Sequence, residues 1–386
     1  MNTILAKIDY DDPDLSQIRK AADILKRGGL VAFPTETVYG LGGNGLDALA
    51  GKKIYEAKGR PSDNPLILHI SDISMLSRIV SEIPKKAYAI MEKFWPGPLT
   101  LIFPKADIVP YEITGGLETV AVRFPSHKIA QLLIKEADLP IAGPSANSSG
   151  KPSPTRASHV MYDLSGRIDM ILDAGATEVG LESTILDITS EVPVLLRPGA
   201  ITREMIEEVI GKIEVDPAVF LKPSKDLVPK APGMKYTHYS PKADITLVRG
   251  DLEKVVQKIN SLTLEDEKKG VKVGIMATTQ TKDKYKSGTV LVVGDREKPE
   301  TIGSNLFKIL RKFDFLEVDV VYSEVFDESG EGVAIMNRLN KSAGYKYIDV
   351  WLFERTCIYD SFRLWPRWFF SYERGYCIPW QQGIRI

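Results

Sequence analysis

The sequence predicts two α/β domains of unequal size, joined by a proline-rich segment, and three observations support this. Short apolar runs of strand length alternate with helical patterns up to about Ile213, which is typical of an α/β domain with a mixed sheet. The periodicity disappears between Lys222 and Pro241, where prolines and lysines are frequent. From Ala243 a second alternation begins, and it predicts a smaller, doubly wound α/β domain.

The larger domain is expected to begin with an amphipathic helix, which Gly28 and Gly29 end. Its apolar residues keep the spacing of one helical face: Leu15, Ile18, Ala22 and Leu25. Further strands are expected at 30–33, 66–70, 99–103, 120–123, 170–172 and 184–188. Further helices are expected at 48–57, 85–94, 128–137 and 202–210.

The smaller domain shows the same alternation. Strands are expected at 245–248, 271–276, 290–293 and 318–322, and helices at 252–259 and 302–313. The chain beyond has another composition, because residues 348–386 hold both cysteines and four of the five tryptophans without periodicity. We interpret this part as an atypical aromatic tail: an extension or a reading-frame error with no bearing on the chemistry, or alternatively an interaction segment.

The bulk numbers exclude several classes of protein. A net charge of −1 over 386 residues gives no global positive field for nucleic acid or membrane. The N-terminus lacks the apolar core of a signal peptide, and no apolar run approaches the ~20 residues that span a bilayer. Two cysteines without a CxxC pair and four histidines argue against a structural zinc site. We therefore expect a cytoplasmic enzyme or binding protein without a metal site of its own.

Two polar, glycine-flanked loops follow apolar strands. The first, FPTETVYGLG at 33–42, presents three hydroxyls and a carboxylate, and the second is GPSANSSG at 143–150. Open α/β sheets bind ligands beyond the strand ends, so these loops predict one shared pocket for a small polar ligand. The run at 40–45 formally matches G-x-G-x-x-G, but residues 34–39 separate it from the strand end, which argues against dinucleotide binding.

Cations at strand ends indicate a polyanionic ligand such as ATP. Lys58 and Arg60 share a proline-stiffened loop, although an isolated K-x-R is more often a solvated turn. Arg123 and Arg197 each close an apolar strand, where a guanidinium is costly unless it meets an anion. No P-loop motif is present. Taken singly, His69 could be a core histidine, and the serines could be turn or helix caps.

Ordered motifs over residues 10–347 together resemble the threonylcarbamoyl-AMP synthase family. The matching segments are FPTETVYGLG (33–42), KGRPSDNPL (58–66), FWPGPLTLI (94–102), VAVRFP (120–125), GPSANSSGKPSPT (143–155), ESTILD (182–187), LLRPGAIT (195–202) and APGMKYTHYSP (231–241). The resemblance implies a YrdC-like catalytic domain at 1–215, with a twisted mixed sheet and flanking helices. A linker or lid at 216–242 and a smaller Rossmann-like α/β domain at 243–347 would follow.

The resemblance also implies a reaction and roles for residues. L-threonine, bicarbonate or carbon dioxide, and ATP would give L-threonylcarbamoyladenylate and pyrophosphate, in the cytoplasm, for modification of an adenosine in tRNA. Residues implied to bind threonine are Thr37, His69, Arg123, Ser145 and Ser183. Residues implied to bind ATP are Lys58, Arg60, Asn64, Thr119, Asn147, Thr155, Arg197 and Tyr239, of which Lys58 and Arg60 would be catalytic. Tyr236 and Tyr239 would form the lid.

Cofactor and partners follow from the same resemblance. Mg²⁺ would bridge the ATP phosphates, with water and the nucleotide as its main ligands. Downstream tRNA threonylcarbamoyl transferase proteins would take the product, RNA is a further candidate partner, and no membrane is expected. The main alternative is a non-catalytic double-stranded-RNA-binding protein of the YrdC-like fold. A carbamoyl-transfer module of metal-centre maturation would be expected to add cysteine-rich or acylphosphatase-like segments, which the sequence lacks.

Overall fold

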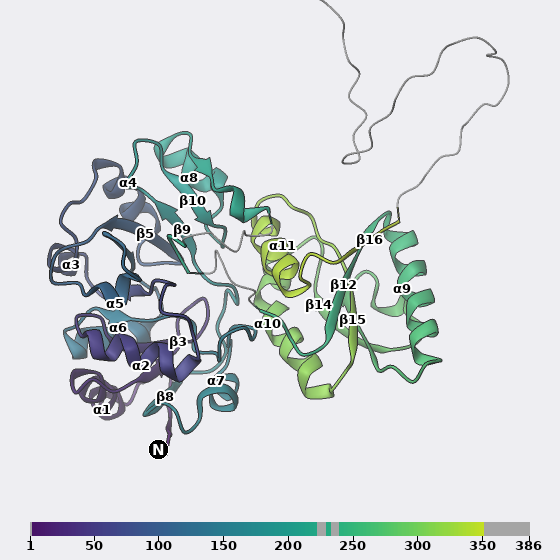
Figure 1. The fold of residues 1–386 in the computed structure, drawn as a ribbon, viewed down its shortest axis with the longest axis horizontal. Coiled ribbons are helices and arrows are strands. Elements are labelled where there is room, and N and C mark those ends of the chain that lie inside the picture. The colour runs from purple at the N-terminus through teal and green to yellow at the C-terminus, as the bar shows by residue number, and fades with distance from the viewer. Residues whose placement is uncertain (1, 222–228, 233–238, 351–386) are drawn as a thin grey trace, which may run out of the picture. The chain divides into compact units, whose positions relative to one another are not determined.

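The computed structural model describes residues 2–221, 229–232 and 239–350. Within them the chain forms an 11-stranded sheet and, after the linker, a separate 5-stranded sheet, each flanked by helices (Figure 1). Of the aromatic tail only residues 348–350 are described, and Tyr236 lies outside the described residues. None of the described helices has the length and apolar character needed to cross a bilayer.

The large sheet is mixed, as the sequence predicts. Its strands are β1 (Ile4–Lys7), β2 (Val31–Phe33), β3 (Gly40–Asn44), β4 (Ile67–His69), β5 (Leu99–Pro104), β6 (Thr119–Arg123), β7 (Ile141–Ala142), β8 (Met170–Asp173), β9 (Thr184–Asp187), β10 (Val194–Arg197) and β11 (Glu214–Val215). Their spatial order is β1-β8-β2-β3-β7-β4-β6-β5-β9-β10-β11. The helices are α1 (Leu15–Lys26), α2 (Ala48–Lys58), α3 (Leu76–Ile79), α4 (Lys85–Phe94), α5 (Tyr111–Thr114), α6 (Lys128–Ala137), α7 (Ala157–Leu164) and α8 (Arg203–Ile210).

Strand register brings polar residues to one edge of this sheet. The last residue of β4, His69, stands opposite the last residue of β6, Arg123, in a parallel pair. Thr100 of β5 stands opposite Arg123 from the other side, in an antiparallel pair. Because parallel strands end at the same edge, side chains distant in sequence meet there. This edge positions the site described below.

The glycine-rich run at 40–44 is a strand rather than the opening of a helix. β3 pairs antiparallel with β2, and Phe33 stands opposite Gly40. A Cβ on Gly42 would come within 2.9 Å of the Ile141 side chain and 3.0 Å of the Phe33 ring, so the glycine lets large side chains pack across the strand. The formal G-x-G-x-x-G therefore has a packing role here.

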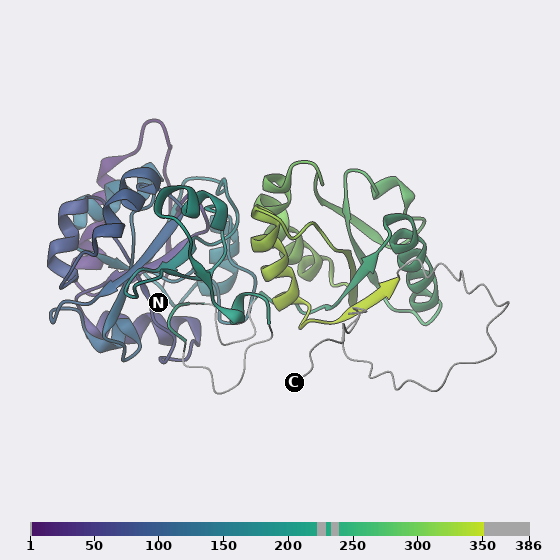
Figure 2. The same ribbon diagram turned by 90° about the horizontal axis from the view of Figure 1, so that it is seen from above.

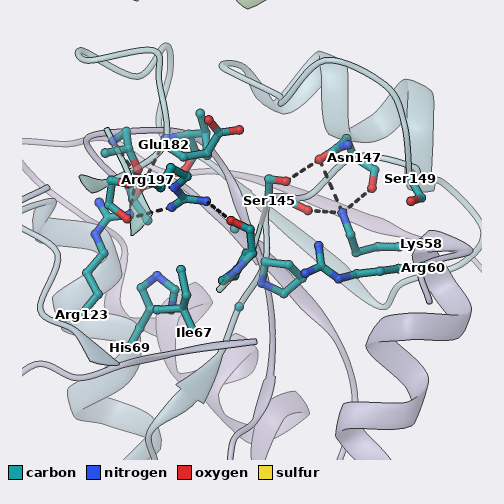
Figure 3. A pocket seen from close by; sticks show the side chains of 18 of the residues that line it. Lys58, Arg60, Ile67, His69, Arg123, Ser145, Asn147, Ser149, Glu182 and Arg197 are labelled. Atoms are coloured by element: carbon teal, nitrogen blue, oxygen red, sulfur yellow. Dashed lines mark hydrogen bonds between the residues drawn. The ribbon is translucent and has the colours of Figure 1, made fainter. Parts of the chain in front are cut away.

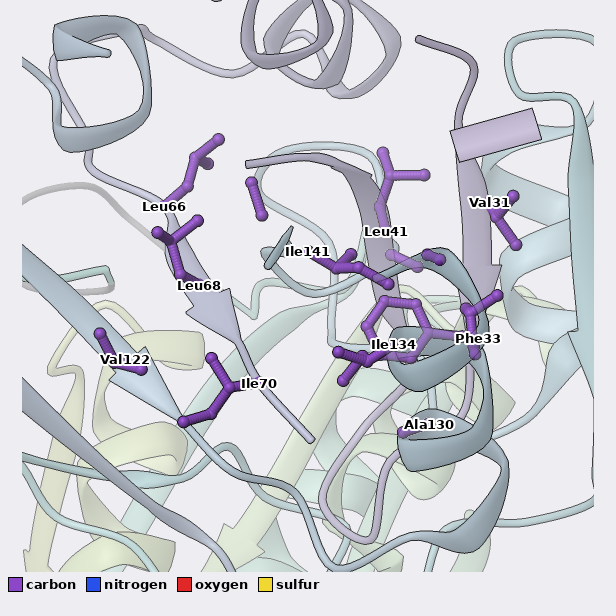
Figure 4. Packing of buried hydrophobic residues seen from close by; sticks show 14 of the residues in the cluster. Val31, Phe33, Leu41, Leu66, Leu68, Ile70, Val122, Ala130, Ile134 and Ile141 are labelled. Atoms are coloured by element: carbon purple, nitrogen blue, oxygen red, sulfur yellow. The ribbon is translucent and has the colours of Figure 1, made fainter. Parts of the chain in front are cut away.

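Apolar faces of the helices and strands form the core of the large domain. Figure 4 shows side chains of β2, β3, β4 and β7 packed with Ala130 and Ile134 of α6. Helix α1 starts at an N-cap, Asp14, whose carboxylate accepts from the Ser16 N–H. Its predicted apolar face is buried at Ile18, Ala22 and Leu25, whereas Leu15 is 48% exposed.

The second sheet is parallel throughout, in the order β14-β13-β15-β12-β16. Its elements are β12 (Asp244–Gly250), α9 (Leu252–Glu267), β13 (Val273–Thr278), β14 (Thr289–Gly294), α10 (Pro299–Leu316), β15 (Val320–Glu324), α11 (Glu331–Ser342) and β16 (Tyr347–Val350). Strand β16 runs past residue 347, where the sequence predicts the domain to end.

Helices cover both faces of this sheet, with α9 on one face and α10 and α11 on the other (Figure 2). Neighbouring residues of one strand accordingly enter different cores: Leu247 packs with α10 and α11, and Val248 packs with α9. A strand that is buried on both faces is the mark of a doubly wound domain. Helix α11 was not among the helices that the sequence predicts.

Replacement of Leu25 by alanine should lower the free energy of unfolding by about 2–5 kcal/mol, because the side chain is fully buried in the core. Leu15→Ala, in the same helix but 48% exposed, is the matched control and should change it by less than about 0.5 kcal/mol. Urea denaturation followed by circular dichroism measures both. Equal destabilisation by the two variants would contradict this assignment of the buried face.

Candidate active site

A pocket lies where the two predicted loops meet the edge of the large sheet. Its predicted members are Thr37, Lys58, Arg60, His69, Arg123, Ser145, Asn147, Ser183, Arg197 and Tyr239. Figure 3 shows Lys58 and Arg60 together on one side, with Arg123, Arg197 and Glu182 across the pocket. Four cations therefore converge on one cavity, as the strand-end pattern predicts.

Backbone hydrogen bonds hold the two loops together. The Tyr39 N–H donates to the Pro154 carbonyl, and the Leu41 N–H donates to the Pro144 carbonyl. In return the Ala146 N–H donates to the Tyr39 carbonyl. Three such bonds fix the loops as one unit, so hydroxyls from both face the same space.

Arg123 meets a carboxylate of the protein itself. Its Nη2 lies 2.7 Å from Glu36 Oε1, without the alignment of a hydrogen bond, and both side chains are almost fully buried. Its Nη1 donates to Thr37 Oγ1 at 2.9 Å. The buried pair offsets the cost of a guanidinium in the core and holds it beside Thr37.

His69 is buried beside Arg123, and Nδ1 lies 3.3 Å from the Ile141 carbonyl. Burial, reinforced by the charge of Arg123, lowers the pKa of His69 to about 3. A Cβ on Gly143 would come within 3.2 Å of the imidazole, so glycine at that position makes room for the ring. The site holds a neutral imidazole across the physiological range of pH.

Lys58, the last residue of α2, is buried beneath the second loop. Its Nζ donates to the carbonyls of Ser145 and Asn147. Burial, together with the nearby charge of Arg60, lowers its pKa well below the usual value. An anion in this pocket would favour the charged ammonium, so the lysine is suited to a phosphate.

Arg60 and Asn64 lie on the loop after α2. The Arg60 guanidinium donates to the Asn64 and Pro65 carbonyls at 3.3 and 3.2 Å. Asn64 is 1% exposed, yet neither polar atom of its side-chain amide has a hydrogen-bond partner within the described parts of the chain. A buried amide without a partner costs free energy, so this position suits a ligand that supplies one.

Arg197 lies across the pocket and is held by Ser183. Its Nε donates to the Ser183 carbonyl at 2.9 Å, and Nη2 donates to Ser183 Oγ at 3.1 Å. Nη1 donates to the carbonyl of Pro232, which belongs to the linker. Ser183 Oγ also shares a 2.7 Å hydrogen bond with Thr100 Oγ1.

The described parts of the linker border the pocket. Ala231 is fully buried against strands of the large sheet, and the Ser240 N–H donates to the Gly150 carbonyl. Tyr239 is 5% exposed, and its ring centroid lies 5.0 Å from that of Phe307 of α10. Its backbone takes a positive φ of 66°. A tyrosine in the left-handed region is strained, which is typical of functional segments.

Three of the implied ATP residues do not line the pocket: Asn64, Thr119 and Thr155. Asn64 is adjacent to Arg60, and Thr155 follows the second loop, where its N–H donates to the His159 ring. Thr119 begins β6 while Arg123 ends it, so the two residues lie at opposite ends of one strand. Thr119 could serve only a part of the ligand that lies beyond the cavity.

Two buried carboxylates at the site received no role from the sequence. Glu36 pairs with Arg123, and Glu182 lines the pocket and pairs with Arg338 of α11 at 3.1 Å. Both residues lie within the motifs that resemble the family, and this position was the only signal in the sequence that they belong to the site. Nothing in the spacing indicated Arg338, because its partner lies 156 residues earlier.

Family models match both domains. The model described as "Telomere recombination" matches residues 23–199, and the model described as "Threonylcarbamoyl-AMP synthase, C-terminal domain" matches residues 201–344. The threonylcarbamoyl-AMP synthase of Pyrococcus abyssi is 52% identical over 334 residues, 86% of this chain and 96% of that protein. This chain belongs to the threonylcarbamoyl-AMP synthase family.

Two further relatives agree with this family. The threonylcarbamoyl-AMP synthase of Bacillus subtilis is 50% identical over 343 residues, 89% of this chain and 96% of that protein. The crystal structure of P. abyssi Sua5 complexed with L-threonine matches with a TM-score of 0.85 at 49% identity, covering 90% of this chain and 100% of that one. The expected fold, a YrdC-like domain followed by a Rossmann-like domain, is confirmed.

The His69 ring should stay neutral from pH 8 down to pH 5, because its pKa is lowered to about 3. Unfolding would return the pKa to about 6.5, so the stability that this histidine contributes is present above pH 6.5 and declines as pH falls toward 3. Nuclear magnetic resonance of the ring, assigned with His69→Gln, measures this directly. Titration near pH 6.5 would contradict the buried, neutral imidazole.

Proposed function

We propose that this chain makes L-threonylcarbamoyladenylate and pyrophosphate from L-threonine, bicarbonate or carbon dioxide, and ATP. The observation that carries the proposal is the pocket itself, where four cations share one cavity with a neutral imidazole and serine and threonine hydroxyls. Relatives of about half-identical sequence carry the name threonylcarbamoyl-AMP synthase. That agreement favours the enzyme over a non-catalytic RNA-binding protein.

Threonine would occupy the Arg123 side of the pocket. The guanidinium beside Thr37 would bind its carboxylate, and neutral His69, Ser145 and Ser183 would accept or donate hydrogen bonds to its amine and hydroxyl. The P. abyssi relative has been crystallised with L-threonine, which supports this substrate. A neutral imidazole suits threonine binding, because it does not repel the positively charged ammonium group that threonine carries before it loses a proton and reacts.

ATP would occupy the side of Lys58, Arg60 and Arg197. Those cations would bind phosphate oxygens, as guanidinium and ammonium groups do elsewhere. Asn147 accepts from Lys58 and from Ser145 Oγ, so it links the two halves of the pocket. The unpartnered amide of Asn64, next to Arg60, would gain its hydrogen bonds from the nucleotide.

The chemistry then needs positioning rather than a protein nucleophile. The neutral threonine amine attacks carbon dioxide and gives up a proton to water, which forms a carbamate. A carbamate oxygen attacks the α-phosphorus, and the bond to the pyrophosphate oxygen breaks. Lys58 and Arg60, the catalytic pair in this proposal, would stabilise the charge that develops on the phosphate oxygens.

Mg²⁺ would accompany ATP and neutralise phosphate charge. Across the residues that the structure describes, no group of three metal-ligating side chains occurs, and the pocket carboxylate Glu182 already accepts from Ser153 and Arg338. The ion fits this site as part of the nucleotide, with water as its other ligand. Oxygens of the phosphates would therefore set its position.

The linker would act as a lid. The cavity volume is about 60 Å³, whereas ligand pockets usually measure roughly 300–1,000 Å³. Tyr239 and Pro232 border this narrow space, so we expect the linker to move outward to admit ATP. Return of the lid would exclude water from a labile mixed anhydride. Tyr236, the other residue of the proposed lid, lies outside the described chain.

The product would pass to tRNA threonylcarbamoyl transferase proteins in the cytoplasm, with RNA as a further candidate partner. Product analysis by mass spectrometry tests the whole proposal. Full-length protein with ATP, threonine and bicarbonate should give threonylcarbamoyladenylate and pyrophosphate, and omission of any one component should abolish the adduct. The absence of adduct with all three components present would refute the proposal.

Arg60→Ala should reduce threonine-dependent pyrophosphate release by about 10²–10³-fold, because it removes one charge from the phosphate site. The fold should persist, since Arg60 lies on a surface loop after α2. Arg203→Ala is the matched control, because its exposed pair with Glu207 on α8 lies outside the pocket. If Arg60→Ala released pyrophosphate as fast as the control, Arg60 would not bind the phosphates as proposed.

A further inference from the structure

The second domain places a buried arginine against the pocket. Arg338 of α11 is 0% exposed, and its guanidinium spans two loops of the first domain. Nε donates to Glu182 Oε2 at 3.1 Å, Nη1 donates to the Pro198 carbonyl at 2.6 Å, and Nη2 donates to the Glu182 carbonyl at 3.3 Å. One side chain thus joins the segments just before Ser183 and just after Arg197.

Glu182 is the carboxylate that lines the pocket. It accepts from Ser153 Oγ at 2.5 Å, so it also touches the end of the second loop. Burial acts to raise its pKa, but the charges of Arg338 and Arg197 outweigh this and hold the pKa below its usual range. A carboxylate that stays ionised here opposes triphosphate binding unless a cation neutralises it.

Arg197 is the cation whose orientation depends on the charge of Glu182. It now donates to Ser183 and to Pro232, and none of these bonds goes to Glu182. Glu182 nevertheless precedes Ser183 directly, and its charge acts on Arg197. If Arg338 were lost, Glu182 would keep its hydrogen bond from Ser153 but lose its ion pair. Its charge would then draw Arg197 toward it, since a buried charge without an ionic partner is costly.

We propose that Arg338 is a positioning residue for the ATP site, supplied by the second domain. It neutralises Glu182, and so leaves Arg197 on Ser183 and directed at the phosphates. This inference rests on the proposed function, and it gives the second domain a task in catalysis. The residue acts through Glu182 and Arg197, and it does not itself line the pocket.

A second arginine of the same domain holds the opposite loop. Arg311 of α10 donates to both oxygens of Asp163, at 3.3 and 2.8 Å, and to the Pro152 carbonyl. Asp163 in turn accepts from the Ser148 N–H, one residue after Asn147. Arg311 therefore fixes the loop that carries Asn147, and Arg338 fixes the segments that carry Ser183 and Arg197. Of the two, Arg338 is the one whose partner faces the ligand.

Four full-length variants test the inference: Arg338→Met, Arg338→Lys, Glu182→Gln, and the double variant Arg338→Met/Glu182→Gln. Arg338→Met should raise the KM and the Kd for ATP by about tenfold or more, with a smaller fall in kcat. The double variant should return both to within about threefold of wild type, because the unpaired charge is gone. Arg338→Lys, which keeps the charge, should also stay within about threefold.

If Arg338 only joined the two domains, the opposite result would be expected. The double variant would still lack the contact, so its KM and Kd for ATP would be as high as those of Arg338→Met. That result, or an unchanged ATP affinity in Arg338→Met, would overturn the inference. If circular dichroism shows that Arg338→Met is unfolded, the test rests on Arg338→Lys. A tenfold loss of ATP affinity in Arg338→Lys would then overturn the inference. Arg249→Met, which breaks an exposed pair with Asp349, is the control.

The affinity for ATP is measured by calorimetry without turnover, so this inference and the proposed function fail separately. Wild-type protein that forms the adduct, together with normal ATP affinity in Arg338→Met, would remove only the positioning role. Wild-type protein that forms no adduct would remove the proposed function, whatever the variant does.

Discussion

Burial of positive charge is the constraint on which the rest of the structure depends. Lys58, Arg123 and Arg197 are 3%, 4% and 5% exposed, although cations avoid such positions unless an anion compensates them. Arg123 has Glu36, but Lys58 and Arg197 are held mainly by carbonyl and hydroxyl oxygens. A pocket arranged in this way suits an anionic ligand, which agrees with the clustering of cations in a chain of almost zero net charge.

The remaining architecture serves to hold that cluster in place. The mixed sheet brings His69 opposite Arg123, and two mutually bonded loops supply the hydroxyls above them. The second domain adds Arg311, whose partner Asp163 bonds to the second of these loops, and Arg338, whose partner Glu182 precedes Ser183. Parallel strands, loops and the second domain thus contribute to one electrostatic site, and none of the three forms it alone.

Much of this could be predicted from the sequence, because periodic patterns carry local information. The apolar face of α1, apart from the exposed Leu15, and the strand-end cations Arg123 and Arg197 lie where the spacing predicts. Helix α11 was not predicted, because its buried face includes Asn337, Arg338 and Lys341, which interrupt the apolar period. The partner of Arg338 is far away in sequence, and no local pattern encodes such a pairing.

The same limit applies within the site. The motif containing Asn64 predicts a role beside Arg60, but spacing alone does not reveal that its amide is buried without a partner. Likewise, Thr119 and Arg123 share one strand, yet strand geometry separates its two ends by about 3.3 Å per residue. Residue identity predicts a chemistry for the site, and three-dimensional packing decides which residues face the cavity.

Comparison of the binding of ATP and adenosine to the full-length protein tests the central claim most directly. If buried cations drive recognition, calorimetry should show ATP binding at least about a hundredfold more tightly than adenosine, which lacks the phosphates. Equal affinity for the two ligands would mean that the base and ribose alone are recognised, and it would contradict the account.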